Sequence, residues 1–275
     1  MTKASTIHGQ INQTKRWVLM PNDSEIKTAL VTGGNRGIGK EIALALGRAG
    51  IDVVLTYRSN DDEANAVVED LRSLGRTATA LRLDLAEPAE LDRFVENCQA
   101  ILERGFASAR LDYLVNNAGF GKNLPIESLT FEDFDAFNNV HFKSVVFLTQ
   151  KILATMNDQG SVVFITAAGD RYIVPGYATY GACKGAIEVF SRYVAKEYGP
   201  RGIRSNTVAP GGIVTDFNNA TIRSNPQAQS FIIGQTAMGR LGQADDISGV
   251  VSFLCSDGSR WMTGQRLEVT GGFNL

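Results

Sequence analysis

The strongest constraint on the fold is the alternation of short apolar segments with longer amphipathic segments along most of the chain. Several of the short segments are almost entirely apolar, as expected for strands that are covered on both faces. The longer segments repeat apolar residues at helical spacing, for example Leu91, Phe94, Val95 and Cys98 among charged residues. This alternation predicts an α/β fold, a doubly wound parallel sheet of about seven strands with helices on both faces.

The chain has 275 residues, of which 44% are hydrophobic, and can bury the core of one large domain. We expect this domain to cover residues 26–275 and residues 1–25 to be a disordered polar extension. The first 22 residues contain no Asp or Glu, so a targeting segment is the alternative, and Met20 is an alternative start. The expected strands are 28–33, 51–57, 77–85, 111–117, 161–166, 202–210 and 266–271, and the expected helices are 37–49, 61–74, 88–104, 131–156, 177–199 and 244–256.

Charge and composition argue against several kinds of partner. The net charge of −2 comes with no basic stripe, so neither nucleic acid nor an anionic membrane is expected to bind. No apolar run approaches the roughly 18 residues that span a bilayer. The three cysteines lie far apart and the only histidines are His8 and His141, so we expect neither a disulfide framework nor a metal site. These features favour a cytoplasmic location.

A glycine-rich turn, "TGGNRGIG" at residues 32–39, directly follows the first expected strand and begins the first expected helix. Glycines at positions 33, 37 and 39 leave room for a pyrophosphate, and the helix N-terminus supplies free N–H groups and a partial positive charge. The glycine spacing differs from the usual dinucleotide-binding fingerprint. A tight strand-to-helix connection is the alternative interpretation of this turn alone.

Three further motifs follow: "NNAG" at 116–119, Tyr180-x-x-x-Lys184 and "PGGIVT" at 210–215. With the glycine-rich turn, their order and separations resemble the short-chain dehydrogenase/reductase family over nearly the whole chain after residue 26. The resemblance implies a single Rossmann-like domain that binds NAD or NADP and transfers hydride to or from the carbon of a small carbonyl or alcohol substrate. It also implies a homotetramer or homodimer.

Tyr180 and Lys184 form a candidate acid/base pair. Four residues apart on an expected helix, they share a face, so the ammonium can lie near the phenol and favour its phenolate form. Tyr180 is therefore a candidate general acid/base. An incidental pair on an amphipathic helix is the alternative. The resemblance implies that Lys184 also holds the nicotinamide ribose.

The second expected strand ends in Thr56-Tyr57-Arg58-Ser59, without the carboxylate that would bind a free ribose 2′-hydroxyl. Arg58 instead offers a donor fork suited to a 2′-phosphate, and Arg36 is a second cation, which favours NADP(H) over NAD(H). Two solvated surface charges are the alternative. The residues and the resemblance together give a cofactor site of Gly33, Asn35, Arg36, Gly37, Ile38, Gly39, Arg58, Ser59, Asp84, Leu85, Asn117, Ala118, Gly119, Tyr180, Lys184, Pro210, Gly211, Ile213 and Thr215.

The resemblance implies a mobile lid at about residues 212–240 that covers the substrate. Tyr177, Phe217, Phe231 and Ile232 are candidates for an apolar pocket wall. Core packing or subunit contact is the alternative for these side chains.

The chain departs from the family pattern at two positions counted from Tyr180. The substrate-orienting serine falls on Ala167, which cannot donate a hydrogen bond, and the helix asparagine falls on His141. Thr166 is the nearest replacement donor, but strand alternation turns it away from Ala167 unless the chain bulges. His141 can donate and accept, so a relay role is open beside that of an ordinary helix histidine.

Two hypotheses follow. The first is an NADPH-dependent reductase of a ketone or aldehyde, or the reverse oxidation, with Tyr180 as general acid/base and Lys184 and His141 in support. In this hypothesis Thr166, a backbone group or a water replaces the serine. The second is a catalytically weak protein of the same fold that binds NADP in a regulatory role.

Overall fold

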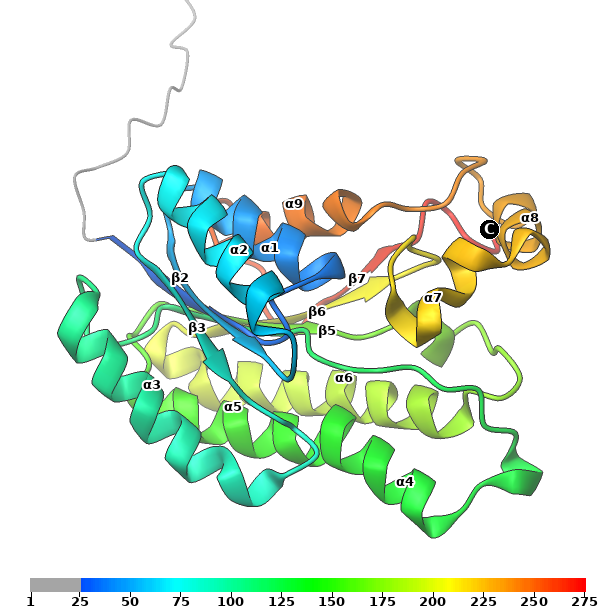
Figure 1. Cartoon of the computed structure of the whole chain (residues 1–275), viewed down its shortest axis with the longest axis horizontal. Coiled ribbons are helices and arrows are strands. Elements are labelled where there is room, and N and C mark those ends of the chain that lie inside the picture. Colours follow the sequence, from blue (N-terminus) through cyan, green and yellow to red (C-terminus); the bar gives the residue numbers. More distant parts are fainter. Residues whose placement is uncertain (1–25) are drawn as a thin grey trace, which may run out of the picture.

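Seven parallel strands form one sheet in the middle of the molecule, in the order β3-β2-β1-β4-β5-β6-β7 (Figure 1). The structure is a computed structural model that describes residues 26–275, apart from the side chains of residues 170, 219 and 221. The expectations for residues 1–25 therefore lie outside the described residues. The predicted doubly wound sheet is confirmed, with strands β1 (Thr28–Val31), β2 (Asp52–Tyr57), β3 (Ala78–Arg82), β4 (Tyr113–Asn116), β5 (Ser161–Ile165), β6 (Arg204–Pro210) and β7 (Arg266–Val269).

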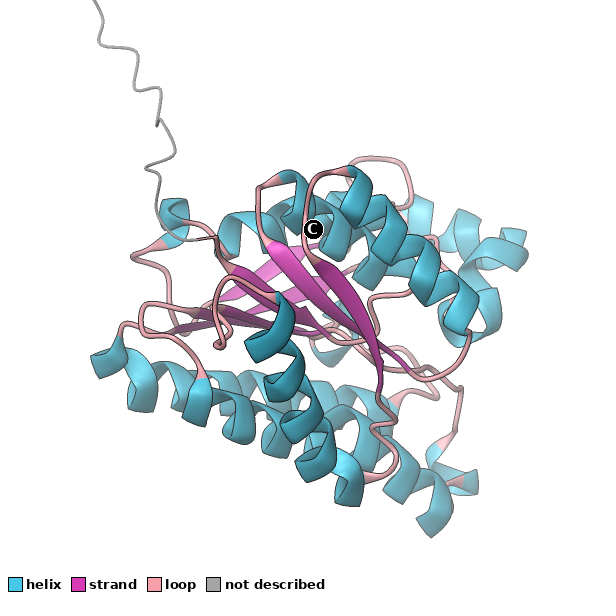
Figure 2. Cartoon of the chain, turned by 60° about the vertical axis from the view of Figure 1, so that its left-hand side comes forward, coloured by secondary structure: helices cyan, strands magenta, loops and turns pink. Residues whose placement is uncertain are grey.

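Two sets of helices bury the two faces of the sheet (Figures 1 and 2). Neighbouring residues of β1 divide between the two cores: Ala29 and Val31 pack with one set and Leu30 with the other. All three side chains are fully buried, and this explains why the strand is uniformly apolar in sequence. One face carries α1 (Gly37–Arg48), α2 (Asp61–Ser73) and α9 (Ala244–Leu254), and the other carries α3 (Leu91–Gly105), α5 (Ser144–Thr155) and α6 (Ala178–Tyr198).

The strand order reverses between β1 and β4. The chain that leaves β1 runs through α1 on one face to β2, whereas the chain that leaves β4 runs through α5 on the opposite face to β5. The loops at the carboxyl ends of these two strands therefore separate. Doubly wound sheets bind their ligands at such a switch point.

The structure divides the helix expected at residues 131–156. α4 (Phe131–Asn138) leads into a π-helical turn, η3 (Asn139–Lys143), before α5 begins. π-Helical turns inside helices are frequent at functional sites. The turn places His141 at the bend, where its side chain is almost fully buried.

The expected lid segment contains two helices that the sequence pattern did not predict, α7 (Phe217–Ser224) and α8 (Pro226–Gly234). Asn225 separates them, and its side-chain oxygen accepts hydrogen bonds from the first N–H groups of α8. Short 3₁₀ turns complete the chain at η1 (Pro88–Glu90), η2 (Ile126–Ser128), η4 (Ala168–Asp170), η5 (Gly199–Arg201) and η6 (Asp257–Ser259).

None of the helices within residues 26–275 has both the length and the apolar character needed to cross a bilayer. Over the same residues, no cluster of His, Cys, Asp or Glu side chains could hold a metal ion.

Candidate active site

A cavity of about 590 Å³ opens at the carboxyl ends of the strands. Segments that follow each of the seven strands contribute to its lining, from Gly33 after β1 to Phe273 after β7. This volume is typical of sites for small molecules and cofactors. The structure brings together around this one cavity every residue of the expected cofactor site, together with Thr166 and His141.

The glycine-rich turn is shaped by close backbone approach. Gly33 has a φ of +64°, and a Cβ on Gly39 would lie 2.1 Å from the Gly33 oxygen, so neither position accommodates a side chain. The turn ends at α1, whose first N–H groups have no partners within the helix. These features fit a pyrophosphate held against a helix N-terminus.

Asn117 holds the turn in place from the neighbouring strand. Its amide nitrogen donates to the backbone oxygens of Thr32 (2.9 Å) and Gly33 (3.2 Å). The Thr32 hydroxyl in turn accepts from the backbone N–H groups of Asn117 and Ala118. The Asn117 amide nitrogen is therefore engaged with protein backbone and fixes the shape of the turn.

Arg36 and Arg58 are exposed at the cavity and form no ion pair with another described residue. A third cation in this region, Arg82 at the end of β3, was not foreseen from the sequence. Its Nε donates to the Arg58 oxygen at 3.2 Å. The strand register pairs Arg82 with Tyr57, so a correct alignment of β2 and β3 would have revealed it. Three guanidinium groups in one region can neutralise a phosphate.

Tyr180 and Lys184 both line the cavity from α6. The Lys184 Nζ lies 5.7 Å from the centre of the Tyr180 ring and donates to the Ile165 oxygen at 2.8 Å. Lys184 is only 7% exposed, so its charge acts on the phenol with little screening by water. The expected proximity of the two groups is thus present in the structure.

Ala167 and Thr166 face in different directions at the end of β5. The backbone at Ala167 is extended, with φ −156° and ψ 149°, and Thr166 N keeps the sheet hydrogen bond to Val208 O at 2.8 Å. No bulge therefore turns the Thr166 hydroxyl, which is directed to Glu188 Oε1 (3.2 Å) and Val208 O (3.3 Å). This geometry does not support Thr166 as a donor to a substrate oxygen.

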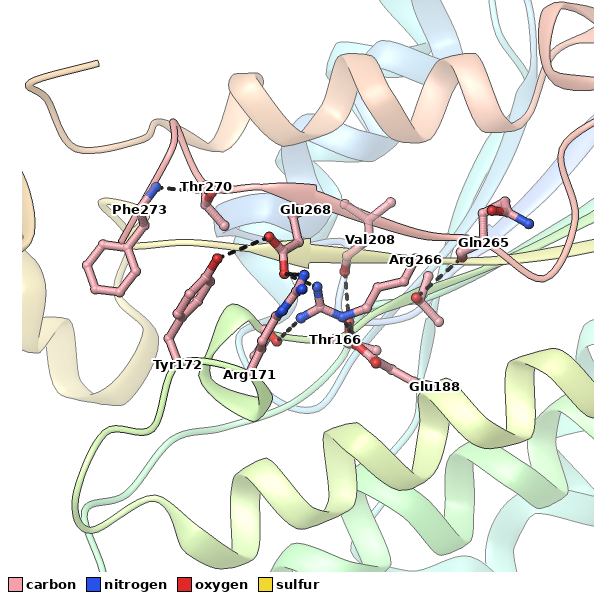
Figure 3. A network of polar contacts seen from close by, with 12 residues as sticks. Thr166, Arg171, Tyr172, Glu188, Val208, Gln265, Arg266, Glu268, Thr270 and Phe273 are labelled. Atoms are coloured by element: carbon pink, nitrogen blue, oxygen red, sulfur yellow. Dashed lines mark hydrogen bonds and ion pairs between the residues drawn. The ribbon is translucent and has the colours of Figure 1, made fainter. Parts of the chain in front are cut away.

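A charged network behind Thr166 was not foreseen from the sequence (Figure 3). Arg266 pairs with Glu188, at 2.5 Å, and with Glu268, and its second terminal nitrogen lies 3.4 Å from the Ala167 oxygen. Arg171 also pairs with Glu268, at 3.0 Å. Burial acts to raise the pKa of Glu268, but the hydrogen bonds from the two arginines together lower it below its ordinary value. The network fixes the loop after β5 against β7.

His141 is a neutral donor at the bend between α4 and α5. Burial, and then the charge of Lys184, lower the pKa of His141 well below its ordinary value, against a weaker opposing effect of the Phe120 backbone. Nε2 accepts from Phe120 N–H at 3.4 Å, so the proton resides on Nδ1, which has no partner among the described residues. The ring packs at right angles to Tyr180, with centroids 5.1 Å apart. A buried unpaired donor beside Tyr180 is compatible with a bound water or ligand atom.

The rest of the cavity wall is largely apolar and aromatic. The four wall candidates from the sequence, Tyr177, Phe217, Phe231 and Ile232, all line it. Phe217 lies beside Tyr180, with ring centroids 6.0 Å apart. Six other large wall residues were not foreseen from the sequence. Four come from separate loops and two from α7, beside Phe217: Phe120, Tyr172, Val174 and Phe273 from the loops, and Asn218 and Ile222 from α7.

Residues 33–274 match the family model described as enoyl-(acyl carrier protein) reductase. An oxidoreductase of Methylorubrum extorquens is 37% identical over 248 residues, which cover 90% of this chain and 98% of the relative. A short-chain dehydrogenase/reductase from Serratia marcescens is 32% identical with a TM-score of 0.83, covering 90% of this chain and 98% of that structure. The angucycline C-6 ketoreductase LanV, solved with bound NADP, is 34% identical with a TM-score of 0.84, covering 90% and 95%.

Proposed function

The chain belongs to the short-chain dehydrogenase/reductase family of oxidoreductases, and we propose that it transfers hydride between NADP(H) and the carbonyl carbon of a small ketone or aldehyde. The observation that carries this proposal is the Tyr180 and Lys184 pair, which faces the same cavity as the glycine-rich turn. A module that only bound adenine nucleotides would not require that pair.

The glycine-rich turn and the exposed arginines fit a nicotinamide dinucleotide with a 2′-phosphate. Gly33, Gly37 and Ile38 would cradle the pyrophosphate at the N-terminus of α1. Arg58, Arg36 and Ser59 would hold the 2′-phosphate, a preference supported by the NADP in LanV. The remaining cavity residues would contact the adenine (Asp84, Leu85), the middle of the cofactor (Asn35, Gly39, Asn117, Ala118, Gly119) and the nicotinamide side (Pro210, Gly211, Ile213, Thr215).

The bound cofactor would supply the hydride, and the chain would manage the proton. Tyr180 donates its phenol proton to the carbonyl oxygen as the carbon is reduced, and the Lys184 charge stabilises the phenolate that remains. In the oxidation direction Tyr180 takes the proton back. Lys184 would also hold the nicotinamide ribose, and neutral His141 would offer its Nδ1–H to a bound water.

The aromatic wall favours a ketone or aldehyde with an apolar body. Phe120, Tyr172, Phe217, Phe231 and Phe273 come from five separate parts of the chain and all face the cavity. Large apolar surfaces of this kind bind through buried area rather than through specific polar contacts. LanV, whose structure is similar to that of this chain, is an angucycline ketoreductase.

A specific observation favours a second candidate function. Ala167 presents a methyl group where a hydroxyl donor would help, and Thr166 is turned away, so a catalytically weak NADP-binding regulatory protein is the competing proposal. Removal of one such donor costs on the order of 10²–10³ in rate in other enzymes.

Turnover separates the two proposals. Purified protein is mixed with NADPH and a panel of aromatic and aliphatic ketones, diketones and aldehydes, and NADPH oxidation is followed by absorbance, with NADPH binding titrated in parallel. NADPH oxidation that occurs only with substrates of one class supports the reductase proposal. Tight NADPH binding without turnover on any substrate would support the regulatory protein.

We extend the proposal to a cytoplasmic homotetramer or homodimer. Cys98, Cys183 and Cys255 are all unpaired and buried, as is common for proteins of a reducing compartment. Exposed apolar side chains gather on one helix layer, with Phe131 and Phe134 on α4, Phe147 on α5, and Val189 and Tyr193 on α6. Such patches commonly mark contacts between subunits.

A further inference from the structure

A carbonyl oxygen in this cavity needs more than one hydrogen-bond donor for efficient reduction. Negative charge develops on the oxygen as hydride reaches the carbon, and donors aimed at that oxygen stabilise the transition state. Ala167 has no donor, and the Thr166 hydroxyl is already directed to Glu188 and Val208. A second donor therefore has to come from elsewhere in the cavity, from another side chain, a backbone N–H or a bound water.

Among the hydroxyl-bearing side chains that line the cavity, Tyr177 lies nearest to Tyr180 along the chain. It is the N-cap residue of α6, one turn before Tyr180, and it lines the cavity. The two rings lie 6.4 Å apart at an angle of 77°. Both phenols therefore approach the substrate space from the same end of α6.

The Tyr177 oxygen is already an acceptor. Asn218 Nδ2 donates to it at 2.5 Å, and an amide NH₂ group can only donate. The phenol proton of Tyr177 consequently remains available, and no acceptor for it lies among the described residues. A hydroxyl that accepts one hydrogen bond is polarised into a better donor of another.

We propose that Tyr177 donates a hydrogen bond to the substrate carbonyl oxygen and, in this chain, supplies the second donor beside Tyr180. The inference rests on the proposed reductase function. Tyr177 keeps its proton throughout, and the proton of the product alcohol comes from Tyr180. Because Asn218 lies in α7, Tyr177 is oriented only while α7 covers the cavity, which links closure over the substrate to donation.

The test begins with Tyr177→Phe, which removes the hydroxyl and keeps the ring. We expect kcat/KM for the best ketone of the panel to fall by about tenfold to a hundredfold, while the Kd for NADPH stays within about twofold. Tyr198→Phe is the matched control, because Tyr198 lies at the far end of the same helix and does not line the cavity. It should leave kcat/KM unchanged.

The Ala167→Ser variant tests whether a hydroxyl at position 167 and the Tyr177 hydroxyl donate to the same substrate oxygen. Ala167→Ser should raise kcat/KM by about tenfold in the parent protein and should restore most of the loss in Tyr177→Phe, since one hydroxyl then replaces the other. Asn218→Ala should cause a smaller loss than Tyr177→Phe. A full kcat/KM in Tyr177→Phe would overturn the proposal. Equal losses of kcat/KM in Asn218→Ala and Tyr177→Phe that Ala167→Ser does not restore would also overturn the proposal. In that case Tyr177 would only hold α7 in place.

A binding measurement keeps this inference separate from the proposed function. The ketone is titrated into the NADP⁺ complex of the parent protein and of Tyr177→Phe, where no hydride is available for turnover. We expect about fivefold weaker binding in the variant. If the parent protein binds the ketone through Tyr177 but turns nothing over, the reductase proposal fails and the donor role stands. If turnover occurs and neither binding nor kcat/KM depends on Tyr177, only the donor role fails.

Discussion

At the scale of single residues, the proposed preference for NADP(H) rests on charges at the edge of the cavity. Neither Arg58 nor Arg36 has a carboxylate partner among the described side chains, and Arg82 donates to the Arg58 backbone oxygen. A dianionic 2′-phosphate is attracted to such a cluster, whereas a 2′-hydroxyl gains little from it.

Arg58→Asp should therefore weaken NADPH binding by about a hundredfold or more and change NADH binding by less than about fivefold. The new carboxylate repels the 2′-phosphate and can accept from a ribose hydroxyl. Titration of both cofactors by fluorescence checks this, with Arg82→Gln as a milder comparison. NADPH affinity that stays unchanged in Arg58→Asp would remove Arg58 from the cofactor site.

At the scale of secondary-structure elements, the start of α9 shows how one carboxylate stabilises a helix. The Asp246 side chain accepts from Gln243 N–H and from both terminal nitrogens of Arg240. The Arg240 hydrogen bond, aided by the Gln243 N–H, lowers the pKa of Asp246 to about 2. Since the folded value lies below the unfolded one, the stabilisation is present above pH 4 and is lost as the pH falls toward 2.

Asp246→Asn should lower the free energy of unfolding by about 1 kcal/mol at pH 7, after allowance for solvent screening of a partly exposed pair. The difference between the variant and the parent should shrink between pH 4 and pH 2. Urea unfolding over this pH range measures it, provided that both proteins unfold in two states. A difference that stayed constant with pH would show that the charge of Asp246 is not the cause.

The secondary structure was largely predictable because each strand and most helices carry a local pattern. The strand at 161–166 and the helix at 177–199 were expected within one or two residues of β5 and α6. The π-helical turn at residues 139–143 and helix α7 were not foreseen, since no spacing in their sequences distinguishes them from a continuous helix or a loop. Helix α8 was also missed, although Asn225 followed by Pro226 is a start signal for a helix.

The candidate site was predictable where a motif holds its own residues together, as in Tyr180 and Lys184. It was not predictable where contacts join distant segments. Thr166 meets Glu188, 22 residues away, and Tyr177 meets Asn218, 41 residues away, and no local pattern in the sequence reports either pair. The strand alternation did predict correctly that Thr166 and Ala167 would face opposite sides unless the chain bulged.

At the scale of the whole molecule, one helix layer carries exposed apolar side chains that a second copy of the chain could cover. Phe147→Glu, on α5, should shift the protein toward a smaller species, because a buried carboxylate at a subunit contact is costly. Size-exclusion chromatography with light scattering measures this, and Phe147→Leu, which stays apolar, should retain the parent mass. An unchanged mass in Phe147→Glu would place the subunit contact elsewhere.

The central claim is that Tyr180 donates the proton while hydride passes from NADPH to a carbonyl carbon. The most direct test compares the parent protein with Tyr180→Phe on the best ketone of the panel, measuring kcat for NADPH oxidation and the Kd for NADPH. We predict a fall in kcat of at least about a thousandfold with a Kd within about threefold of the parent value, because only the proton donor is removed. A variant that keeps most of its kcat would contradict the claim.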